Sequence, residues 1–472
     1  MVRPAEFQAE PGSFRDPSGR VFYWRERVYR SIGRAAAPHY EFLRDSGLLK
    51  RLQDSGRLLP CAESAVPASF AELLPPDTVL LLEHPRIPFI SYPYEWTFRS
   101  LQRAALLHLD LHLELLEHGA TLSDATAYNV QFNGPDPVFI DLLSIRRYRD
   151  GEFWLGHRQF CEQFLNPLLL RAWTGVPFNE WYRGRLEGLP TDALSNLLPW
   201  WRKLNPRTLV HVTLQAAGQR RATQKQVSAD GRRLPRQAYA SMLHGLRDWI
   251  TALRPPDSST STWGDYAESN SYDAAQTREK HDAVRAFVTK AKPRLMYDIG
   301  CNTGEFARTA LAAGARLVVG LDADHGALDR AATAVESDRL AFIPLWMDLA
   351  NPSPAQGWAQ SERMGLGSRA PADATVALAL VHHLAIGRNV PLAQVAEWLL
   401  SLAPRLMVEF VPKSDPMVQL MLRNREDIFP GYDLKNFRRE LGRVGRIVSQ
   451  TPVGNRDRFL LEVERLAVDG AD

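Results

Sequence analysis

A short apolar run that ends in an acid and two glycines constrains this chain more than any other feature. The run 295–297 leads to Asp298, and Gly300 and Gly304 follow before a helix-forming stretch at 305–313. This order predicts a buried strand, a tight turn and a helix N-terminus, which is where open α/β sheets bind ligands. The glycines allow positive φ and a close approach of the ligand to the backbone.

The other residues of this turn argue against a dinucleotide as the ligand. A dinucleotide fingerprint has three glycines, so that a pyrophosphate sits on the helix N-terminus. Here Asn302 replaces the middle glycine and Glu305 the last. Because a carboxylate in the first helical turn repels a phosphate, the turn suits a ligand with an amino-acid end and no phosphate. S-adenosylmethionine fits that description.

The sequence Asp-Ile-Gly-Cys-Asn-Thr-Gly at 298–304 resembles motif I of the class I S-adenosylmethionine-dependent methyltransferases. The resemblance covers residues 262–465 and is closest to the branch that includes nodulation-protein-type methyltransferases. It implies a Rossmann-like seven-stranded α/β sheet and S-adenosyl-L-methionine as cofactor. Alone, such a turn also occurs in structural strand–turn–helix junctions. By the resemblance, the cofactor contacts in the turn are Asp298, Gly300, Cys301, Asn302, Thr303 and Gly304.

Further acids follow the next two predicted strands. The strand at 317–321 ends at Asp322, and an acid there can accept from both ribose hydroxyls. The alternative for Asp322 is a helix N-cap. The strand at 340–346 precedes Asp348 and Leu349, where the family contacts adenine. The remaining predicted elements are helices at 327–337 and 392–402, a strand at 405–411 and an antiparallel pair at 446–450 and 459–463.

An almost fully apolar strand at 374–381 leads to His382 and His383, where the family's motif IV lies over the methyl group and substrate. A hydroxyl or amine nucleophile loses a proton, and histidine, with an ordinary pKa of about 6.5, suits that task. His383 is the first candidate base, His382 the second and Glu409 the third. The alternative is a hydrogen-bonded structural histidine.

The methyl acceptor is constrained by a missing motif. No Asn-Pro-Pro-Tyr-type sequence follows the strand at 374–381, which weakens the case for an amide or nucleobase nitrogen. We therefore expect O-methylation of a small molecule, a sugar or a lipid-linked glycan.

The stretch 254–260, with two prolines and three hydroxyl residues, is the clearest linker in the chain. It divides the chain into an N-terminal domain at 1–254, a linker and helical preface at 255–290, and a methyltransferase domain at 291–472. The resemblance implies that the preface folds over the cofactor and makes Tyr272 and Lys280 candidate contacts. Packing of the preface onto the sheet is the alternative.

The N-terminal domain contains a second informative pattern. After an apolar helix at 101–118 come Asp124 and Asn129, and an apolar strand then ends at Asp141. Kinases use an Asp to accept the substrate hydroxyl proton, and an Asn and a strand-end Asp to hold magnesium. By this resemblance the domain is an α+β kinase-like domain, and the three residues match these roles. The alternative is that Asp124 and Asn129 are turn and helix-end residues.

Several departures predict that the kinase-like domain is degenerate. Leu122 replaces the catalytic-loop histidine, and the turn at 16–19 has a single glycine in place of a Gly-rich loop. No lysine precedes Lys50, so only Arg25, Arg27 or Arg30 could face nucleotide phosphates, and arginine is no equivalent of lysine there. An accessory role is expected, with Mg-ATP as the cofactor only if the chain is a bifunctional kinase–methyltransferase.

Simple local patterns predict the remaining N-terminal elements. They indicate a hairpin formed by 14–15 and 21–24, a helix at 40–53, strands at 78–83 and 89–92, and Trp- and Leu-rich helices over 153–250.

Composition narrows the choice of partners. The 472 residues suit two to three domains, and a net charge of +3 gives no strong signature for nucleic acid or membrane. The basic run at 219–237 lacks interleaved aromatics, so we expect a solvated loop and treat an RNA methyltransferase as an alternative.

The three cysteines have no paired spacing, which argues against a disulfide framework or a zinc site. With neither a signal peptide nor a transmembrane run predicted, a cytoplasmic protein is expected.

Overall fold

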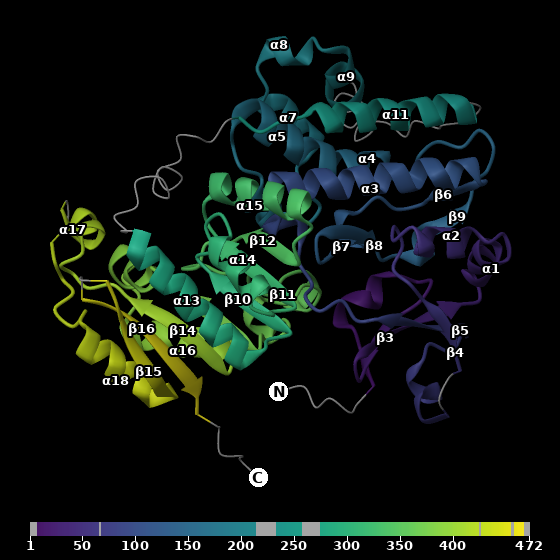
Figure 1. Ribbon diagram of the computed structural model, residues 1–472. Coiled ribbons are helices and arrows are strands. Elements are labelled where there is room, and N and C mark those ends of the chain that lie inside the picture. The colour runs from purple at the N-terminus through teal and green to yellow at the C-terminus, as the bar shows by residue number, and fades with distance from the viewer. Residues whose placement is uncertain are drawn as a thin grey trace. The chain divides into compact units, whose positions relative to one another are not determined.

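The structure is a computed structural model that describes residues 7–65, 68–213, 233–256, 274–423, 426–454 and 457–466. The chain divides into two compact units (Figure 1). Unit 1 contains Met1–Pro256 and Ala355–Met364, and unit 2 contains Asp257–Pro354 and Gly365–Asp472. Tyr272 and residues 219–232 of the basic run lie outside the described residues.

Unit 2 is built on one sheet. Its strands are β10 (Leu295–Ile299), β11 (Leu317–Asp322), β12 (Phe342–Trp346), β13 (Ala374–Ala377), β14 (Arg405–Phe410), β15 (Gly445–Val453) and β16 (Arg458–Arg465). The order is β12-β11-β10-β13-β14-β16-β15, with β10–β14 parallel and β16 antiparallel to both of its neighbours. The α/β fold and the C-terminal antiparallel pair predicted from the sequence are confirmed.

Helices cover the sheet of unit 2 on both faces. Every residue of β10, β12 and β13 is buried, as parallel strands between two helical layers require. The helices α13, α14 and α15 pack with Met296, Phe342 and Met407 into one apolar cluster. A second pair, α16 and α18, lies against β14 and β15 (Figure 1). The bounds are α13 (Ala274–Ala291), α14 (Glu305–Ala312), α15 (His325–Asp338), α16 (Leu392–Leu402), α17 (Pro416–Leu422) and α18 (Leu434–Val444).

The strand order of unit 2 places a site at the carboxyl end of β10. The chain continues from β10 to β11 on one side and later returns to β13 on the other. The connections therefore diverge at β10, and a crevice forms where they separate. The turn at 300–304 and the residues that follow β11, β12 and β13 all meet at this edge.

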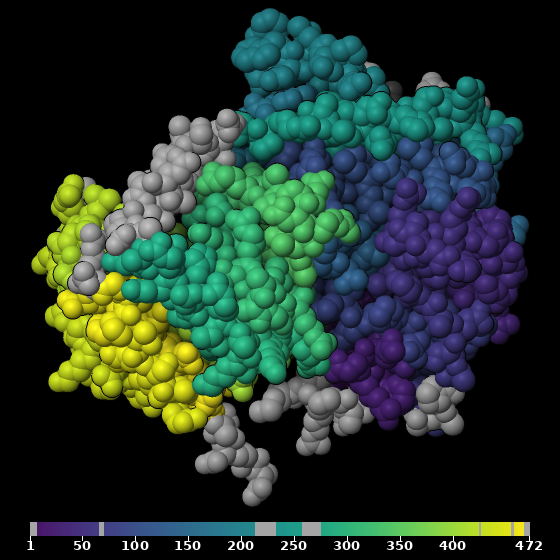
Figure 2. Space-filling model, viewed as in Figure 1, coloured from purple at the N-terminus to yellow at the C-terminus, as the bar shows by residue number. Residues whose placement is uncertain are grey.

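Unit 1 begins with a five-stranded antiparallel sheet. Its strands are β1 (Gln8–Ala9), β2 (Val21–Trp24), β3 (Arg27–Gly33), β4 (Ala62–Ser64) and β5 (Thr78–Pro85), in the order β1-β2-β3-β5-β4. The long helix α3 (Phe98–Glu117) follows, and α11 (Arg236–Ala252) lies along it. Asp110 of α3 accepts a 2.5 Å hydrogen bond from Arg247 of α11. Figure 2 shows the outward side of α11 in teal.

The part of unit 1 that follows α3 contains two small two-stranded sheets and short helices. β6 (Ala120–Leu122) pairs with β9 (Ile145–Arg147), and β7 (Val130–Asn133) pairs with β8 (Asp136–Phe139). The helical elements of the region are α4 (His157–Phe160), η6 (Cys161–Leu165), α5 (Asn166–Thr174), α6 (Asn179–Gly184), α7 (Thr191–Leu197), α8 (Trp200–Lys203), α9 (Pro206–Thr208) and η7 (Leu209–Thr213). The kinase-like nature of unit 1 stays a prediction.

Three local predictions for unit 1 are wrong. The helix expected at 40–53 is two helices, α1 (Ala37–Asp45) and α2 (Leu48–Asp54), because Gly47 has φ +74 and interrupts the helix. Residues 11–15 form a 3₁₀ turn, so the first hairpin joins β2 to β3 instead.

The strand expected at 89–92 is also missing. The amide of Gln131 takes the place of a neighbouring strand, because it accepts from the N–H of Ser91 at 3.0 Å and donates to the Ser91 carbonyl at 3.0 Å.

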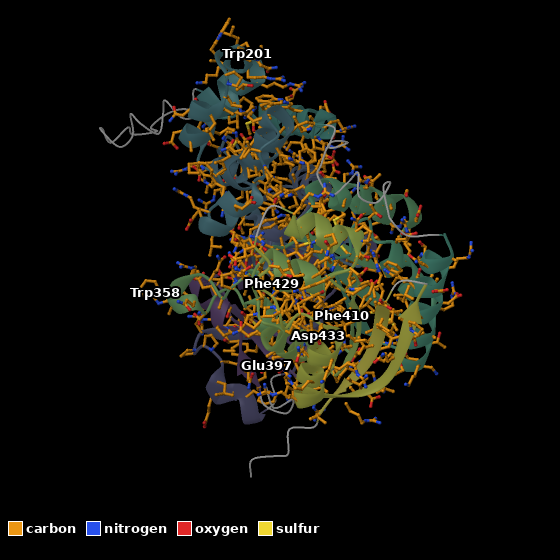
Figure 3. The ribbon with its side chains drawn as sticks, turned by 90° about the vertical axis from the view of Figure 1, so that its left-hand side faces the viewer. Trp201, Trp358, Glu397, Phe410, Phe429 and Asp433 are labelled. Carbon is orange, nitrogen blue, oxygen red and sulfur yellow. The ribbon has the colours of Figure 1, made fainter. Side chains whose placement is uncertain are left out.

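A segment between β12 and β13 leaves unit 2 and packs within unit 1. Its Glu362 pairs with Arg15 at 2.6 Å, and the N–H of Met364 donates to the Tyr92 hydroxyl at 2.8 Å. Trp358 projects outward from this segment with 70% of its surface exposed (Figure 3). The sequence analysis assigned all of 291–472 to one domain and did not predict this excursion.

Among the described residues, no helix has both the length and the apolar character needed to cross a membrane.

The close packing of β11 generates a stability prediction. A Cβ at Gly320 would lie 2.5 Å from Phe342 Cε2 and 2.7 Å from Cys301 Sγ. Gly320→Ala should therefore lower the free energy of unfolding by about 1–3 kcal/mol. Gly367→Ala, where no atom lies within 4 Å, is the control and should change it by less than about 0.5 kcal/mol. Urea unfolding would measure both, and equal effects would contradict the packing argument.

Candidate functional site

The turn after β10 has a backbone that suits close approach of a ligand. Gly300, Asn302 and Gly304 have φ values of +81, +48 and +78. The Gly300 N–H donates to the Leu321 carbonyl at 2.8 Å, which fixes the turn on β11. A Cβ at Gly304 would lie 2.4 Å from Phe342 Cε1, so both conformation and space require glycine there. Cys301 and Thr303 complete the turn, and Cys301 is buried.

Asp322, at the end of β11, holds this turn from the side. Its Oδ2 accepts from the Asn302 N–H at 2.8 Å, and its Oδ1 accepts from the Asp324 N–H at 2.9 Å. A carboxylate has about four lone-pair positions, so both oxygens keep capacity for ligand hydroxyls. The N-cap alternative for Asp322 is wrong, because Asp324 caps α15 by accepting from the N–H groups of Gly326 and Ala327.

Asp298 is a buried acid with an unsatisfied oxygen. Its Oδ2 has no hydrogen-bond partner among the described residues, and the side chain is almost fully buried. Burial, together with the nearby charge of Asp322, raises the pKa of Asp298 to about 7. Such an oxygen, beside a positive-φ turn, fits the cationic or hydrogen-donating end of a ligand.

Asp348 and Leu349 follow β12 at the same edge of the sheet. Asp348 Oδ1 accepts from the Ala350 N–H at 3.0 Å, and its Oδ2 lies 3.6 Å from Arg388 Nη2. The carboxylate of Asp348 is 30% exposed, so it remains accessible to a ligand amine.

The two candidate bases follow β13, at the start of the π-helical turn η10 (His383–Gly387). Their ring centroids are 4.1 Å apart. His382 is buried, and neither of its ring nitrogens has a hydrogen-bond partner among the described residues, while His383 is only partly buried. Burial lowers the pKa of His383 to about 4 and lowers that of His382 well below its ordinary value. Both rings are therefore neutral near pH 7, and their lowered pKa values make them weaker bases than an ordinary histidine.

Lys280 belongs to a buried charge network that the sequence analysis missed. Its ammonium donates to Glu409 Oε2 at 2.7 Å, and the same oxygen accepts from the Ala379 N–H at 2.9 Å. Arg458 lies 3.5 Å from Glu409 Oε1 and 2.5 Å from Asp415 Oδ2. Glu409 is thereby committed to holding the loop after β13, which argues against its role as the third candidate base. Lys280 takes part in holding that loop.

The predicted kinase-like residues come together in unit 1. Asn129 Nδ2 donates to Asp141 Oδ2 at 3.2 Å. Burial, and the nearby charge of Asp141, raise the pKa of Asp124. Arg30 Nη2 lies 2.8 Å from Asp141 Oδ1 and 2.5 Å from Asp16 Oδ2. A guanidinium thus occupies one face of the carboxylate that would hold magnesium in a kinase.

The raised pKa of Asp298 gives a pH prediction for the ligand-free protein. The folded protein retains the proton up to about pH 7, whereas the unfolded chain releases it near 3.8. The free energy of unfolding should therefore fall as pH rises from about 4 to 7, and Asp298→Asn should remove that fall. The variant should gain stability over the wild type by at most about 1.4 kcal/mol per pH unit in this range.

Urea unfolding between pH 4 and 8 would measure this difference. Asp338→Asn, at the exposed end of α15, controls for the loss of a charge alone. Parallel stability curves for Asp298→Asn and the wild type would contradict the assignment.

Comparison with solved structures yields only low scores. Magnesium protoporphyrin IX methyltransferase of Synechocystis PCC 6803 is 20% identical, with 44% of this chain and 97% of that chain covered and a TM-score of 0.32. N-methyltransferase NodS of Bradyrhizobium japonicum WM9 is 14% identical, with 41% and 99% covered and a TM-score of 0.31. WbdD is 17% identical, with 46% of each chain covered and a TM-score of 0.30. These TM-scores are too low to assign the chain to the family of any of these proteins.

Comparison with known sequences gives a full-length relative. No family model matches the chain. Nodulation protein NoeA of Rhizobium meliloti strain 1021 is 44% identical over 458 residues, which cover 96% of this chain and 95% of that protein. The resemblance to a nodulation-protein branch is confirmed by this match. The chain belongs to the family of nodulation protein NoeA.

Proposed function

We propose that the chain is an S-adenosylmethionine-dependent methyltransferase that transfers a methyl group to a hydroxyl of a small molecule or glycan. The observation that carries the proposal is the row of acids at one sheet edge: Asp298, Asp322 and Asp348 end or follow β10, β11 and β12 around a glycine turn. Three carboxylates repel phosphate but suit a ligand that offers an ammonium, two hydroxyls and an aromatic amine.

Each acid then has a separate part in binding. Asp322 would accept from the ribose hydroxyls, and Asp348 from the exocyclic amine of adenine, with Leu349 beside the ring. Asp298 and the backbone of the turn would hold the amino-acid end. Near a ligand ammonium, the Asp298 carboxyl would ionise, because an opposite charge favours the charged form.

The chain's own contribution to methyl transfer is orientation and proton removal. The cofactor supplies the electrophilic methyl group and its leaving group. The loop at 378–383 would hold the acceptor hydroxyl in line with that methyl, since Glu409 fixes this loop through Ala379. His383 would take the hydroxyl proton, and the buried ring of His382 would pack behind it.

Binding of S-adenosylhomocysteine tests the proposal directly. At about 100 times its dissociation constant, a bound ligand adds about 2.7 kcal/mol to the free energy of unfolding. The full chain should show a raised unfolding midpoint with this ligand. Asp322→Ala should lose the rise, relative to its own ligand-free midpoint, because the ribose loses its acceptor.

The matched control is Asp338→Ala, which replaces an exposed acid on α15 and should keep the full rise. No rise in the wild type would overturn the proposed cofactor. An acceptor screen with methyl-labelled cofactor would follow, and base-stable label would exclude a methyl ester as the product.

For unit 1 we propose an accessory role without phosphoryl transfer. Arg30 already neutralises Asp141, and a second cation at that carboxylate would have to displace it. The alternatives are a bifunctional kinase–methyltransferase and an RNA methyltransferase. Residues 219–232 of the basic run on which the RNA alternative rests lie outside the described residues.

Magnesium–ATP distinguishes the accessory role from the bifunctional one. We expect no change in the unfolding midpoint of the wild type with magnesium–ATP, because Arg30 occupies the metal-binding carboxylate. Adenosine alone serves as the control for weak binding of the base. A rise that depends on magnesium and is lost in Asp141→Asn would contradict this expectation and favour the bifunctional alternative.

A further inference from the structure

Three side chains that favour soft metal ions meet in the helical part of unit 1. His157 lies on α4, Cys161 begins η6, and His211 lies on η7. His157 Nε2 is 3.0 Å from His211 Nδ1 and 3.7 Å from Cys161 Sγ, and the three ligand atoms lie within 4.8 Å of one another. The proposed methyltransferase and kinase-like sites use none of these residues.

The chain brings the three together by its local helical geometry. His157 and Cys161 are four residues apart on one continuous helical stretch, so their side chains share a face. Both η6 and η7 are single π-helical turns, an irregular form that is frequent at functional sites. The π turn of η7 carries His211, which supplies the third ligand from a distant part of the chain.

Two of the three separations are close to those within a tetrahedral zinc site. With zinc–nitrogen and zinc–sulfur lengths of about 2.05 and 2.3 Å, tetrahedral angles put two nitrogens about 3.3 Å apart and a nitrogen and sulfur about 3.6 Å apart. The two separations from His157 Nε2, 3.0 and 3.7 Å, lie close to these values. The third pair, Cys161 and His211, lies within 4.8 Å, so zinc binding would draw these two side chains together.

His157 Nε2 is shared by two neighbours. It faces both His211 Nδ1 and Cys161 Sγ. One ring nitrogen has one proton or one lone pair, so bonds to both neighbours would form a shared, three-centre hydrogen bond. A cation between the three atoms would contact all of them at once.

Burial and ligand chemistry also suit a metal. Cys161 is fully buried, and His211 is buried near Trp249. Imidazole and thiolate together select zinc or copper over magnesium and calcium.

The cluster lies on the helix that holds the loop containing Asp124. Gln159 and Gln163, from the same helical stretch as His157 and Cys161, accept from the N–H groups of Ala125 and Ala127 at 2.9 and 2.8 Å. Anything that fixes this helix therefore fixes the loop.

We propose that His157, Cys161 and His211 bind one zinc ion, which fixes the helix that positions the loop around Asp124. The thiol proton of Cys161 leaves to solvent on binding, and a water completes the coordination. The cysteine spacing alone predicts no zinc site, because two of the three ligands are histidines.

The test uses the full chain freed of metal with a chelator. Zinc, titrated against a coloured competing chelator, should bind with one tight equivalent. Cobalt as a substitute should give the intense absorption of a thiolate–cobalt bond. Cys161→Ser and His211→Gln should each weaken zinc binding by more than about 100-fold, beyond the range for residues outside the first coordination shell.

Cys61→Ser is the matched control. Cys61 lies in the same unit, and its Sγ accepts a hydrogen bond from Gln53 Nε2 at 3.1 Å. It should keep full affinity and the cobalt absorption. Circular dichroism of each variant would establish that it folds. Absence of the thiolate–cobalt absorption in the folded wild type would overturn the proposal, as would equal zinc affinity in wild type, Cys161→Ser and His211→Gln.

Discussion

The carboxylates of Asp298 and Asp322 lie on adjacent parallel strands at the turn around which unit 2 is organised, and both are substantially removed from water. Burial, and then the nearby charge of Asp322, raise the pKa of Asp298. The fold tolerates these two carboxylates because Asp322 accepts two backbone N–H bonds, while Asp298 can remain protonated. The ligand-free site thus has an unmet preference for a hydrogen-bond donor or a cation, which is the physical basis of the proposed cofactor binding.

Buried charges are arranged differently at the loop after β13 and at β14 of the same sheet. There Lys280, Glu409, Arg458 and Asp415 form a buried network of two cations and two anions. Removing one partner of such a network leaves an uncompensated buried charge, which is strongly destabilising. The cofactor side is therefore poised to accept a ligand, whereas the loop after β13 is held by charges that already balance.

The sequence predicted what depends on local order. Apolar runs that end in Asp298 and Asp322 predicted β10 and β11. This was possible because a buried parallel strand and its polar end are formed by consecutive residues. Arg458 could not be connected to Asp415, because it is one of three consecutive charged residues at 456–458 and its partner lies 43 residues earlier in the chain. The closeness of His211 to His157 was not predicted either, because the two residues are 54 positions apart in the sequence. The strand expected at 89–92 failed because a side chain, Gln131, satisfies the backbone there.

The excursion at 355–364 makes the chain pass between its two units at three places, after Pro256, Pro354 and Met364. A protease that cut only in the predicted linker would release no separate domain. A fragment of residues 1–256 would lack the partner of Arg15, and the complementary fragment would carry Glu362 without Arg15. In evolution, the same topology opposes exchange of either half by a single recombination event, so the two units are expected to be inherited together.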